Sequence, residues 1–377
     1  MLRVLHCIYD DPDNPWVGGG GALRVRELYR RLVGEVEATV ATGAFPGAAD
    51  REIDGIHYRR LGLPRPYAAS RLTYGLAATR LLARGDYDVG LFDYSVYTPI
   101  RLPRDRPVGL VVHMLHGPTA GGRWGAPGAA LVNRVEVAGI RSARWISTTS
   151  RWMVEQLQPL VAPGTRIVPV GSGVPPEFTA VQREEADHFL FYGRLDIYQK
   201  GLDTLLAAFA RFRADHPGFR LVIAGRGKDE AELVEMIRES GLASAVELIP
   251  RPARAQVLTL MAGALAMVMP SRLEGLPMAP AEAMAAAVPV IASRVGAVEE
   301  IVISGSTGLI VPPADPAALA AAMSRLAADA DLRAAMSAEA RRSAARFSWD
   351  TVARAHLDYL RAIAGDVGSY SPAPSSA

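Results

Sequence analysis

The sequence predicts an α/β fold with two doubly wound, parallel-sheet domains. Short apolar segments, typical of buried parallel strands, alternate with segments of helical periodicity along almost the whole chain. This alternation is interrupted once, at 170–187, by a Gly/Pro-punctuated and then charged stretch that is typical of a domain boundary. The chain has 377 residues, and its 50% hydrophobic content is enough for more than one core. Two similar αβ halves facing across a cleft are the simplest architecture.

The first domain is expected over residues 1–178. An apolar run enters a strand directly, and a polar loop then leads to four glycines that precede an amphipathic helix. Strands are predicted at 2–8, 37–42, 56–61, 89–94, 108–115 and 145–149. Helices are predicted at 22–33, 70–83, 128–141 and 151–160.

The second domain is expected over residues 186–346, where a new αβ series begins at His188. Its strands are predicted at 189–192, 220–224, 246–249, 265–269 and 288–292. Helices are predicted at 202–214, 230–240, 254–262, 278–287, 316–328, 332–346 and 349–364. We treat 347–364 as a separate C-terminal helix, and the Ser/Pro/Gly/Ala-rich segment 365–377 is predicted to be a disordered tail.

Charge and cysteine content narrow the classes of function. The net charge is only +2, which argues against a nucleic-acid-binding protein. The first half is mildly basic, which favours an anionic acceptor or peripheral contact with a membrane surface, although so small an excess is usual for a solvated face. The single cysteine, Cys7, excludes an intrachain disulfide and favours a cytoplasmic protein. No signal peptide is expected, because the first residues enter a predicted strand directly, and no apolar run approaches membrane-spanning length.

Two glutamates with seven residues between them follow the strand predicted at 265–269. Glu274 lies in a Gly/Pro-punctuated loop, and Glu282 lies in the first turns of the next helix. Ligands of open α/β sheets bind outside the carboxyl ends of the strands, where carboxylates can accept hydrogen bonds from sugar hydroxyls.

Two alternatives compete with a sugar-binding role for these glutamates. Glu282 can be ordinary helix-start chemistry, and the pair can be the acid and nucleophile of a glycosidase. On one continuous helix the two residues would be roughly 12 Å apart, which is too far for a glycosidase. The loop position of Glu274 leaves that distance open.

A second group of polar residues follows the strand predicted at 189–192. Arg194 lies in the loop after this strand, and Lys200-Gly201 opens the next helix. A guanidinium, an ammonium and free backbone N–H groups at one strand end are the elements that bind a diphosphate. Lys200 and Lys228 are the only two lysines in the chain. The alternative is that Arg194 and Lys200 are solvated surface groups.

Glycine-rich turns occur in both halves. Gly225 and Gly227 follow the strand predicted at 220–224, where they would let a ligand approach the backbone closely, although many αβ turns use glycine. The four glycines at 18–21 match neither a Walker loop nor a good dinucleotide-binding fingerprint. They are interpreted either as a lip that faces phosphates or as a plain linker.

His113 and His116 end the strand predicted at 108–115. Their spacing suits a pair of metal ligands, but no Asp, Glu or Cys lies nearby in sequence to complete a site, so no metal is predicted. Their position at a strand end favours a contact with substrate, and a packed or solvated imidazole is the alternative. The acidic pair Asp11 and Asp13 is interpreted as turn chemistry.

Together these motifs resemble the GT-B glycosyltransferases of retaining glycosyltransferase family 4, the glycosyl transferases group 1. The resemblance covers nearly the whole chain. It rests on Gly193-Arg-Leu-Asp-x-x-x-Lys-Gly201 and on Glu274-x7-Glu282 within Pro-Ser-x-x-Glu-Gly-x-Pro. Supporting matches are Val168-Pro-Val-Gly-Ser-Gly-Val174, Gly225-x-Gly227, Gly296-x-x-x-Glu-Ile-Val302 and Gly305-x-x-Gly-Leu309.

The resemblance implies two Rossmann-like domains, the first binding an acceptor and the second a nucleotide-sugar donor, with the last helix crossing back onto the first domain. It implies transfer of a sugar from a UDP- or GDP-sugar to an acceptor hydroxyl with retention, without a metal ion or other cofactor. The acceptor would be a sugar, a lipid-linked molecule or a small metabolite. Two rival functions on the same fold are a nucleotide-sugar epimerase and a non-catalytic nucleotide-sugar binding protein.

The resemblance also assigns residue roles. Arg194 and Lys200 would bind the donor diphosphate, Glu274 the transferred sugar and Glu282 the ribose. His113 would lie beside the sugar, with His116 as a further, acceptor-side candidate. The other donor-side residues that it implies are Gly20, Gly193, Gly225, Gly227, Ile249, Arg251, Gly275, Leu276, Pro277 and Met278.

The sequence departs from the family pattern at three places. Leu276 stands where an aromatic residue is common, and Ser172 stands where asparagine is frequent. One extra residue, Tyr198 or Gln199, lengthens the loop before Lys200 and puts the geometry of that lysine in question.

Overall fold

The structure is a computed structural model that describes residues 1–16, 19–95, 102–103, 105–116, 121–184 and 187–366, with the backbone alone for 121–125. It divides into two compact units, Met1–Ser172 with Trp349–Ala377, and Gly173–Ser348. Within the described ranges each unit holds one mainly parallel sheet, which confirms the predicted α/β class with two parallel-sheet domains.

The sheet of the first unit has eight strands among the described residues, in the order β3-β4-β2-β1-β5-β6-β7-β8. The strands are β1 (Leu2–Cys7), β2 (Val36–Gly43), β3 (Arg51–Ile53), β4 (Ile56–Leu61), β5 (Val89–Asp93), β6 (Val108–Val112), β7 (Trp145–Thr148) and β8 (Arg166–Pro169). Every described pair is parallel except β3 with β4. The strand order reverses between β1 and β5. Ligands of open α/β sheets bind at the carboxyl ends of the strands beside such a reversal.

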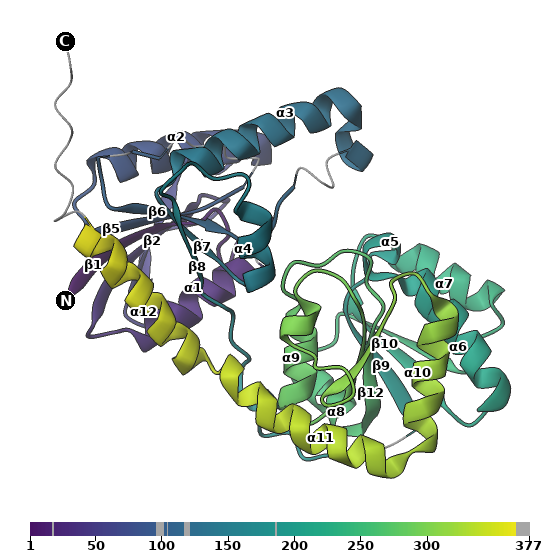
Figure 1. Ribbon diagram of the computed structural model, residues 1–377. Coiled ribbons are helices and arrows are strands. Elements are labelled where there is room, and N and C mark those ends of the chain that lie inside the picture. The colour runs from purple at the N-terminus through teal and green to yellow at the C-terminus, as the bar shows by residue number, and fades with distance from the viewer. Residues whose placement is uncertain (17–18, 96–101, 104, 117–120, 185–186, 367–377) are drawn as a thin grey trace. The chain divides into compact units, whose positions relative to one another are not determined.

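Helices cover both faces of this sheet (Figure 1). On one face α1 (Gly20–Arg31) and α12 (Trp349–Asp366) share a buried cluster with Val4 of β1. On the other face α2 (Tyr67–Arg84), α3 (Gly121–Ser142) and α4 (Arg151–Leu157) pack against Leu5. Adjacent residues of β1 therefore point to opposite faces, as strand geometry requires. The packing places α12 in the first unit although the second unit precedes it in sequence.

The sheet of the second unit has six strands among the described residues, in the order β11-β10-β9-β12-β13-β14, all parallel. The strands are β9 (His188–Arg194), β10 (Arg220–Arg226), β11 (Val246–Pro250), β12 (Ala264–Met269), β13 (Val290–Ser293) and β14 (Gly308–Val311). This is the strand order of dinucleotide-binding folds, and its reversal between β9 and β12 marks the expected ligand site.

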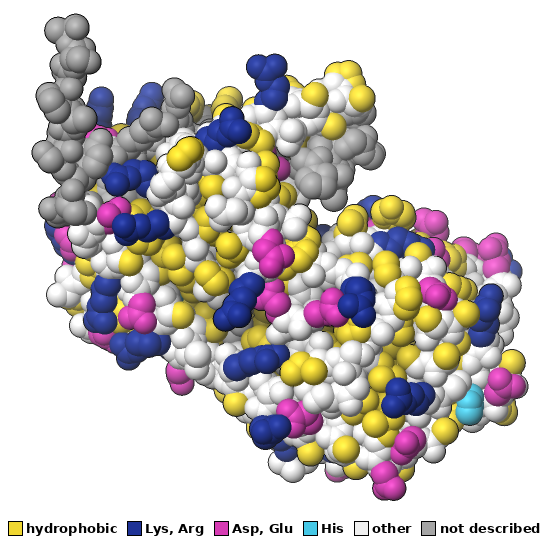
Figure 2. All heavy atoms as spheres, viewed as in Figure 1, with side chains coloured by type: hydrophobic (Ala, Val, Ile, Leu, Met, Phe, Trp, Pro, Cys, Tyr) yellow, Lys and Arg dark blue, Asp and Glu magenta, His cyan; other side chains and the backbone are white. Residues whose placement is uncertain are grey.

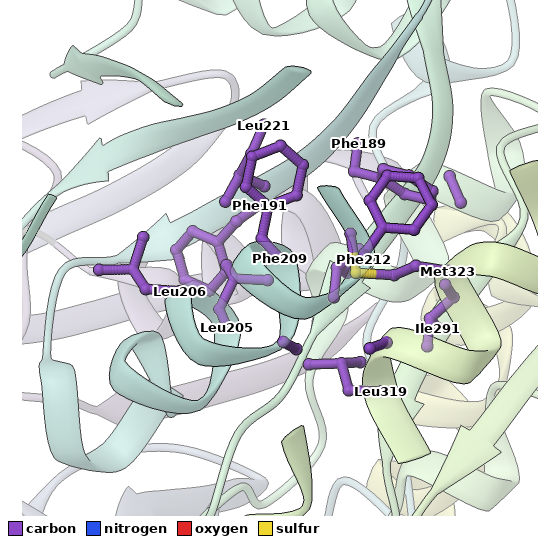
Figure 3. Close-up of a cluster of buried hydrophobic side chains, with 14 of the residues drawn as sticks. Phe189, Phe191, Leu205, Leu206, Phe209, Phe212, Leu221, Ile291, Leu319 and Met323 are labelled. Carbon is purple, nitrogen blue, oxygen red and sulfur yellow. The ribbon is translucent and has the colours of Figure 1, made fainter. Parts of the chain in front are cut away.

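The core of the second unit also lies on both faces of its sheet. The helices are α5 (Ile197–Lys200), α6 (Leu202–Asp215), α7 (Glu230–Glu239), α8 (Arg254–Gly263), α9 (Met278–Ala285), α10 (Pro316–Ala328) and α11 (Ala330–Ala344). Phe189 and Phe191 of β9 pack with Phe209 and Phe212 of α6 on one face (Figure 3). Leu190, between those two phenylalanines in sequence, packs on the other face against α8 and α9.

The structure corrects several predicted boundaries. The strand predicted to end at 115 ends at Val112, so both histidines follow it. The helix expected from 128 begins at Gly121 and contains Pro127. The division between the units falls after Ser172 rather than after 178, because Phe178 is buried in the core of the second unit. The helix α12 continues to Asp366, and the rest of the predicted tail lies outside the described residues.

Three strands, β3, β8 and β14, lie outside the predicted set. β3 and β4 form a hairpin around Asp54 and Gly55, both with positive φ, and this Asp-Gly turn is a hairpin signal in the sequence. β8 and β14 overlap the family motifs that begin at Val168 and Gly305. The short helix α5 occupies the segment that carries the extra residue before Lys200.

Two observations concern the length of the helices and the charges on the surface. Among the helices of the described residues, none is both long and apolar enough to cross a membrane. On the face seen in Figure 2, basic and acidic side chains are interspersed, which is the pattern of a solvated surface.

Replacing Leu360 with alanine tests whether α12 stabilises the first unit. Leu360 is fully buried in the cluster shared by α1, α12 and the first sheet, so we expect its truncation to destabilise that unit by about 2–5 kcal/mol. Hydrogen exchange read by mass spectrometry should show loss of protection in residues 1–172 and little change in 173–348.

Leu326→Ala is the matched control, because Leu326 is equally buried in the second unit. Leu326→Ala should lower hydrogen-exchange protection in residues 173–348 and leave residues 1–172 little changed. Equal loss of protection in both units from Leu360→Ala would contradict the assignment of α12.

Candidate functional site

The residues that follow β9 and β12 meet at the strand-order reversal of the second sheet. Lys200 ends α5, directly after β9, and its Nζ lies 2.5 Å from Oε1 of Glu274, in the loop after β12. Both side chains are largely buried, with 18% of Lys200 and 8% of Glu274 exposed. Ser271 donates a hydrogen bond to the same carboxylate oxygen, at 2.7 Å. The structure therefore joins two of the predicted catalytic residues.

A set of contacts fixes the loop after β12 against α5 and the start of α6. Arg272 pairs with Asp203 through two hydrogen bonds of 2.7 Å, and its backbone N–H donates to the Gln199 carbonyl at 2.9 Å. Gly201 caps α5 in the left-handed region, at φ 63°, where a Cβ would overlap the Pro270 carbonyl. The extra residue before Lys200 is thus accommodated in a helical turn, and the lysine still reaches Glu274.

Arg194 is the last residue of β9, and its side chain is exposed. Among the described residues no acidic side chain pairs with its guanidinium, in contrast to Lys200. The carboxyl end of β9 therefore carries one cation held by a carboxylate and one that is open to a ligand.

Gly225 and Gly227 have a structural role, whereas a Cβ on Gly193 would meet only the Phe191 ring, at 3.4 Å. A Cβ on Gly225 would overlap the carbonyl oxygen of Gly193, its partner on β9, and a Cβ on Gly227 would overlap that of Leu195. Close approach of two backbones, rather than of a ligand, is what requires glycine at these positions. Their donor-binding role stays a prediction.

Glu282 lies in the second turn of α9 and differs from Glu274 in its surroundings. Burial raises the pKa of Glu282 to about 7, an effect that nearby Arg254 opposes and Glu177 reinforces. The closest cation is Nη1 of Arg254, 3.9 Å away, and the Arg254 guanidinium also lies 3.6 Å from Glu177. The two glutamates therefore have different partners, and Glu282 is the one whose charge is poorly compensated.

The residues between the two glutamates form the entry to α9. Ala297 donates to the Gly275 carbonyl at 2.9 Å, and Leu276 and Met278 pack partly against the core. Pro277 is the N-cap, and no side chain of the described residues caps the helix. The first N–H groups of α9 are thus available to an anion.

Two further donor-side candidates lie at the end of β11. Ile249 is half-buried in this strand. Arg251, exposed, adopts φ 52°, a conformation uncommon for a residue other than glycine, and its N–H donates to the Gly225 carbonyl at 2.7 Å. Arg251 is thereby tied to the last residues of β10.

In the first unit, His113 is joined to a carboxylate that the sequence did not single out. Nε2 of His113 lies 3.0 Å from Oδ2 of Asp93, the last residue of β5, and Nε2 of His6 lies 3.0 Å from Oδ1. Burial would raise the pKa of Asp93, but the two histidines outweigh it and hold this pKa below its usual range. Asp93 is therefore an ionised carboxylate between two imidazoles.

The other predicted site residues of the first unit are Gly20 and His116. Gly20 begins α1, and a Cβ there would meet nothing within 4 Å, so its role as a phosphate-facing residue stays a prediction. The His116 backbone N–H donates to both carboxylate oxygens of buried Glu136, at 2.9 and 3.1 Å. Within the part of the chain that the structure describes, no group of three His, Cys, Asp or Glu side chains is arranged to hold a metal ion.

Sequence reasoning missed Asp10, Asp93, Arg254 and Ser271. Asp10 follows β1 closely, and burial, reinforced by Asp93, raises its pKa to about 6. Both aspartates lie where an apolar run ends, the same signal that singled out His113. The acidic pair at 11 and 13 is structural as predicted: buried Asp11 accepts from Asp13 N–H at 3.0 Å and pairs with Arg60.

Comparison with solved structures gives the class of the fold, which is GT-B. Sucrose-phosphate synthase from Thermosynechococcus elongatus is similar with a TM-score of 0.82 at 22% identity, over 97% of this chain and 100% of that chain. HepE from Anabaena, solved in complex with UDP-glucose, is similar with a TM-score of 0.73 at 17% identity, over 98% of this chain and 100% of that chain.

Sequence comparison gives the family. Residues 177–343 match the family of glycosyl transferases group 1, and residues 19–173 match the glycosyl transferase 4-like domain. The chain therefore belongs to the group 1 glycosyltransferase family. Glycogen synthase from Mycobacterium tuberculosis is 33% identical over 267 residues, which are 68% of this chain and 64% of that protein. The match thus spans less than two thirds of the relative's own length.

The two glutamates should respond oppositely to removal of their charge. The pKa of Glu282 rises from 4.5 to about 7 on folding, so its ionisation opposes folding as the pH rises through this range. Glu282→Gln should therefore stabilise the protein by up to about 3 kcal/mol at pH 8 and by less than about 1 kcal/mol at pH 5.

Glu274→Gln is the contrasting variant, because it leaves the largely buried Lys200 ammonium without its carboxylate. It should destabilise the protein by about 3 kcal/mol at pH 8. Urea unfolding at the two pH values measures both effects. A destabilised Glu282→Gln variant at pH 8 would contradict the described electrostatics.

Gly225→Ala tests the close approach of β9 and β10. The added methyl group meets the Gly193 carbonyl, so we expect a loss of about 3 kcal/mol, at the upper end of overpacking effects. Gly218→Ala is the control, because a Cβ at Gly218 meets nothing within 4 Å. Similar unfolding midpoints for the two variants would show that the strands can separate without loss.

Proposed function

We propose that the chain is a retaining glycosyltransferase that moves a sugar from a nucleotide diphosphate sugar to an acceptor hydroxyl without a metal ion. The observation that carries this proposal is the ion pair of Lys200 and Glu274 at the strand-order reversal. The guanidinium of Arg194, at the end of β9, lies nearby in sequence and pairs with no acidic side chain of the described residues. Together they offer cations to a diphosphate and a carboxylate to sugar hydroxyls.

The chemical need is to stabilise the diphosphate as it leaves with growing negative charge. Arg194, Lys200 and the uncapped N-terminus of α9 supply fixed positive potential for it. Lys200 is already held by Glu274, so little reorganisation is needed as the charge develops. These fixed cations support the proposal of a metal-independent reaction.

Retention is proposed on the basis of family membership. The acceptor would attack from the face of the leaving group, and an oxygen of the diphosphate would take the proton of the acceptor hydroxyl. Glu274 would hold hydroxyls of the transferred sugar, and Glu282 would accept from the ribose. Binding ribose hydroxyls would favour the ionised form of Glu282, which burial opposes in the free protein.

UDP-glucose is the first donor to test, with GDP-sugars as the alternative. HepE, which shares the fold, was solved with UDP-glucose, and relatives similar to this chain include a glycogen synthase.

The acceptor is proposed to be a sugar, a lipid-linked molecule or a small metabolite bound by the first unit, and not nucleic acid. α2 exposes Leu72 and Leu76 beside Arg80 and Arg84, and residues 55–85 contain no Asp or Glu. Such a surface suits peripheral contact with anionic lipid headgroups. A cytoplasmic site of action is proposed because Cys7, the single cysteine, is a free thiol.

Lys200→Ala tests the proposed reaction. A panel of nucleotide sugars is first ranked by thermal stabilisation of the wild-type protein, and transfer is then measured with the donor that stabilises most. Loss of the ammonium should lower kcat by about 100- to 1000-fold, which is the effect of removing one hydrogen-bonding group that stabilises negative charge in a transition state. The fold should persist.

The only other lysine provides the control. Lys228 is mostly exposed and lies 3.4 Å from Asp196, so Lys228→Ala should leave transfer within about twofold of the wild type. Unchanged turnover in Lys200→Ala would remove the proposed role of that residue. Donor conversion without an acceptor would favour the epimerase, and donor binding without any turnover would favour the non-catalytic protein.

A further inference from the structure

A buried chain of hydrogen-bonding side chains leads from His113 into the core of the first unit. From Asp93 it passes to His6 of β1, whose Nδ1 lies 2.9 Å from the Tyr29 hydroxyl of α1. That hydroxyl lies 3.4 Å from Nε2 of His356 in α12. His6 and His356 are fully buried, and Tyr29 and Asp93 nearly so. His113 is the member with a substantial exposed surface, 32% of its side chain.

The chemistry of these groups fixes where the protons lie. Asp93 is ionised, so both of its oxygens accept, and the Nε2 atoms of His113 and His6 must each carry a proton. Burial raises the pKa of Tyr29 well above its usual value, so its hydroxyl keeps its proton and, on a neutral His6 ring whose Nε2–H donates to Asp93, donates it to Nδ1. Burial lowers the pKa of His356, which leaves this imidazole neutral with Nε2–H directed to Tyr29.

One consequence concerns the atom that His113 presents to a ligand. Its Nε2–H is used by Asp93, so Nδ1 is the remaining ring nitrogen, and on a neutral ring Nδ1 carries a lone pair. The group that meets it must donate a hydrogen bond. A sugar hydroxyl does so, whereas a carbonyl, an ether oxygen or a phosphate oxygen does not.

We propose that Asp93 is a positioning residue that holds His113 as the Nε2–H tautomer, so that Nδ1 accepts a hydrogen bond from a hydroxyl of the sugar substrate. His6, itself fixed by Tyr29, holds the Asp93 carboxylate in place. The identity of the ligand rests on the glycosyltransferase function proposed above, but the tautomer does not depend on it.

Asp93→Asn is nearly isosteric and changes the proton arrangement. The Asn amide keeps one oxygen, which accepts, but replaces the other with an NH₂ group, which donates. The histidine that faces this NH₂ group must therefore present a lone pair to it. His6 is enclosed between Asp93 and Tyr29, whereas His113 has a free side. We expect His113 to switch to the Nδ1–H tautomer, which turns its ligand-facing nitrogen from an acceptor into a donor.

The first test is a ¹⁵N NMR measurement of histidine tautomers at pH 8.5, with the His113 signals assigned by their loss in His113→Gln. The wild type should show Nε2–H, and Asp93→Asn should show Nδ1–H. Asp86→Asn, which changes an exposed carboxylate, should leave His113 unchanged. An Nδ1–H tautomer in the wild type, or no switch in a folded Asp93→Asn variant, would overturn the proposal.

The second test is kinetic and uses the donor found by thermal stabilisation. Asp93→Asn should lower kcat/KM by about tenfold or more, and the double variant with His113→Gln should be no worse than His113→Gln alone. Additive losses would mean that Asp93 acts on stability and not through His113, which overturns the proposal. If the wild type transfers no sugar, the glycosyltransferase function fails while the tautomer measurement still decides the role of Asp93.

Discussion

In the second unit, β9 is flanked by β10 on one side and β12 on the other, and this reversal of strand order determines the candidate site. Chains that leave two such strands turn to opposite faces of the sheet, so that the first residues of both loops lie side by side. Lys200 and Glu274 therefore form an ion pair although 74 positions separate them in sequence. The pairing of Arg272 with Asp203 and the left-handed cap at Gly201 hold the two loops in this arrangement.

Two glutamates of one motif differ in their electrostatic surroundings. Glu274 has an ammonium and a hydroxyl in direct contact, which compensate its charge in the absence of ligand. Glu282 is buried on α9, with a guanidinium that Glu177 shares, so burial favours its protonated form over the carboxylate. Uncompensated burial of this kind lowers the stability of the fold wherever the carboxylate is ionised.

In the first unit, hydrogen bonds from two histidines stabilise a buried carboxylate at the corresponding place in the sheet. Its strand order reverses between β1 and β5, and Asp93 lies at the end of β5. A buried carboxylate between two imidazoles is stable because each of its oxygens accepts a hydrogen bond from a histidine ring. The chain of contacts includes α12, so the last helix of the sequence supports the surroundings of His113.

The sequence by itself determined the strands that are buried on both faces and the helices between them, because those segments are continuously apolar or have helical periodicity. It also determined the family, since the residues around Arg194 and Glu274 stand in characteristic motifs. It did not reveal the edge strand β3, whose residues are mostly exposed, or the start of α3, where glycines and a proline obscure the helical pattern.

Only the tertiary structure decided which residues meet. The partnership of His113 with Asp93, 20 positions apart, follows from the parallel pairing of β5 with β6. The requirement for glycine at 225 and 227 follows from the neighbouring backbone, which a Cβ at either position would overlap. Burial of Glu282 against Arg254 likewise depends on how α8 and α9 pack. Side-chain partners and local desolvation arise between elements distant in sequence, so periodicity and motifs cannot specify them.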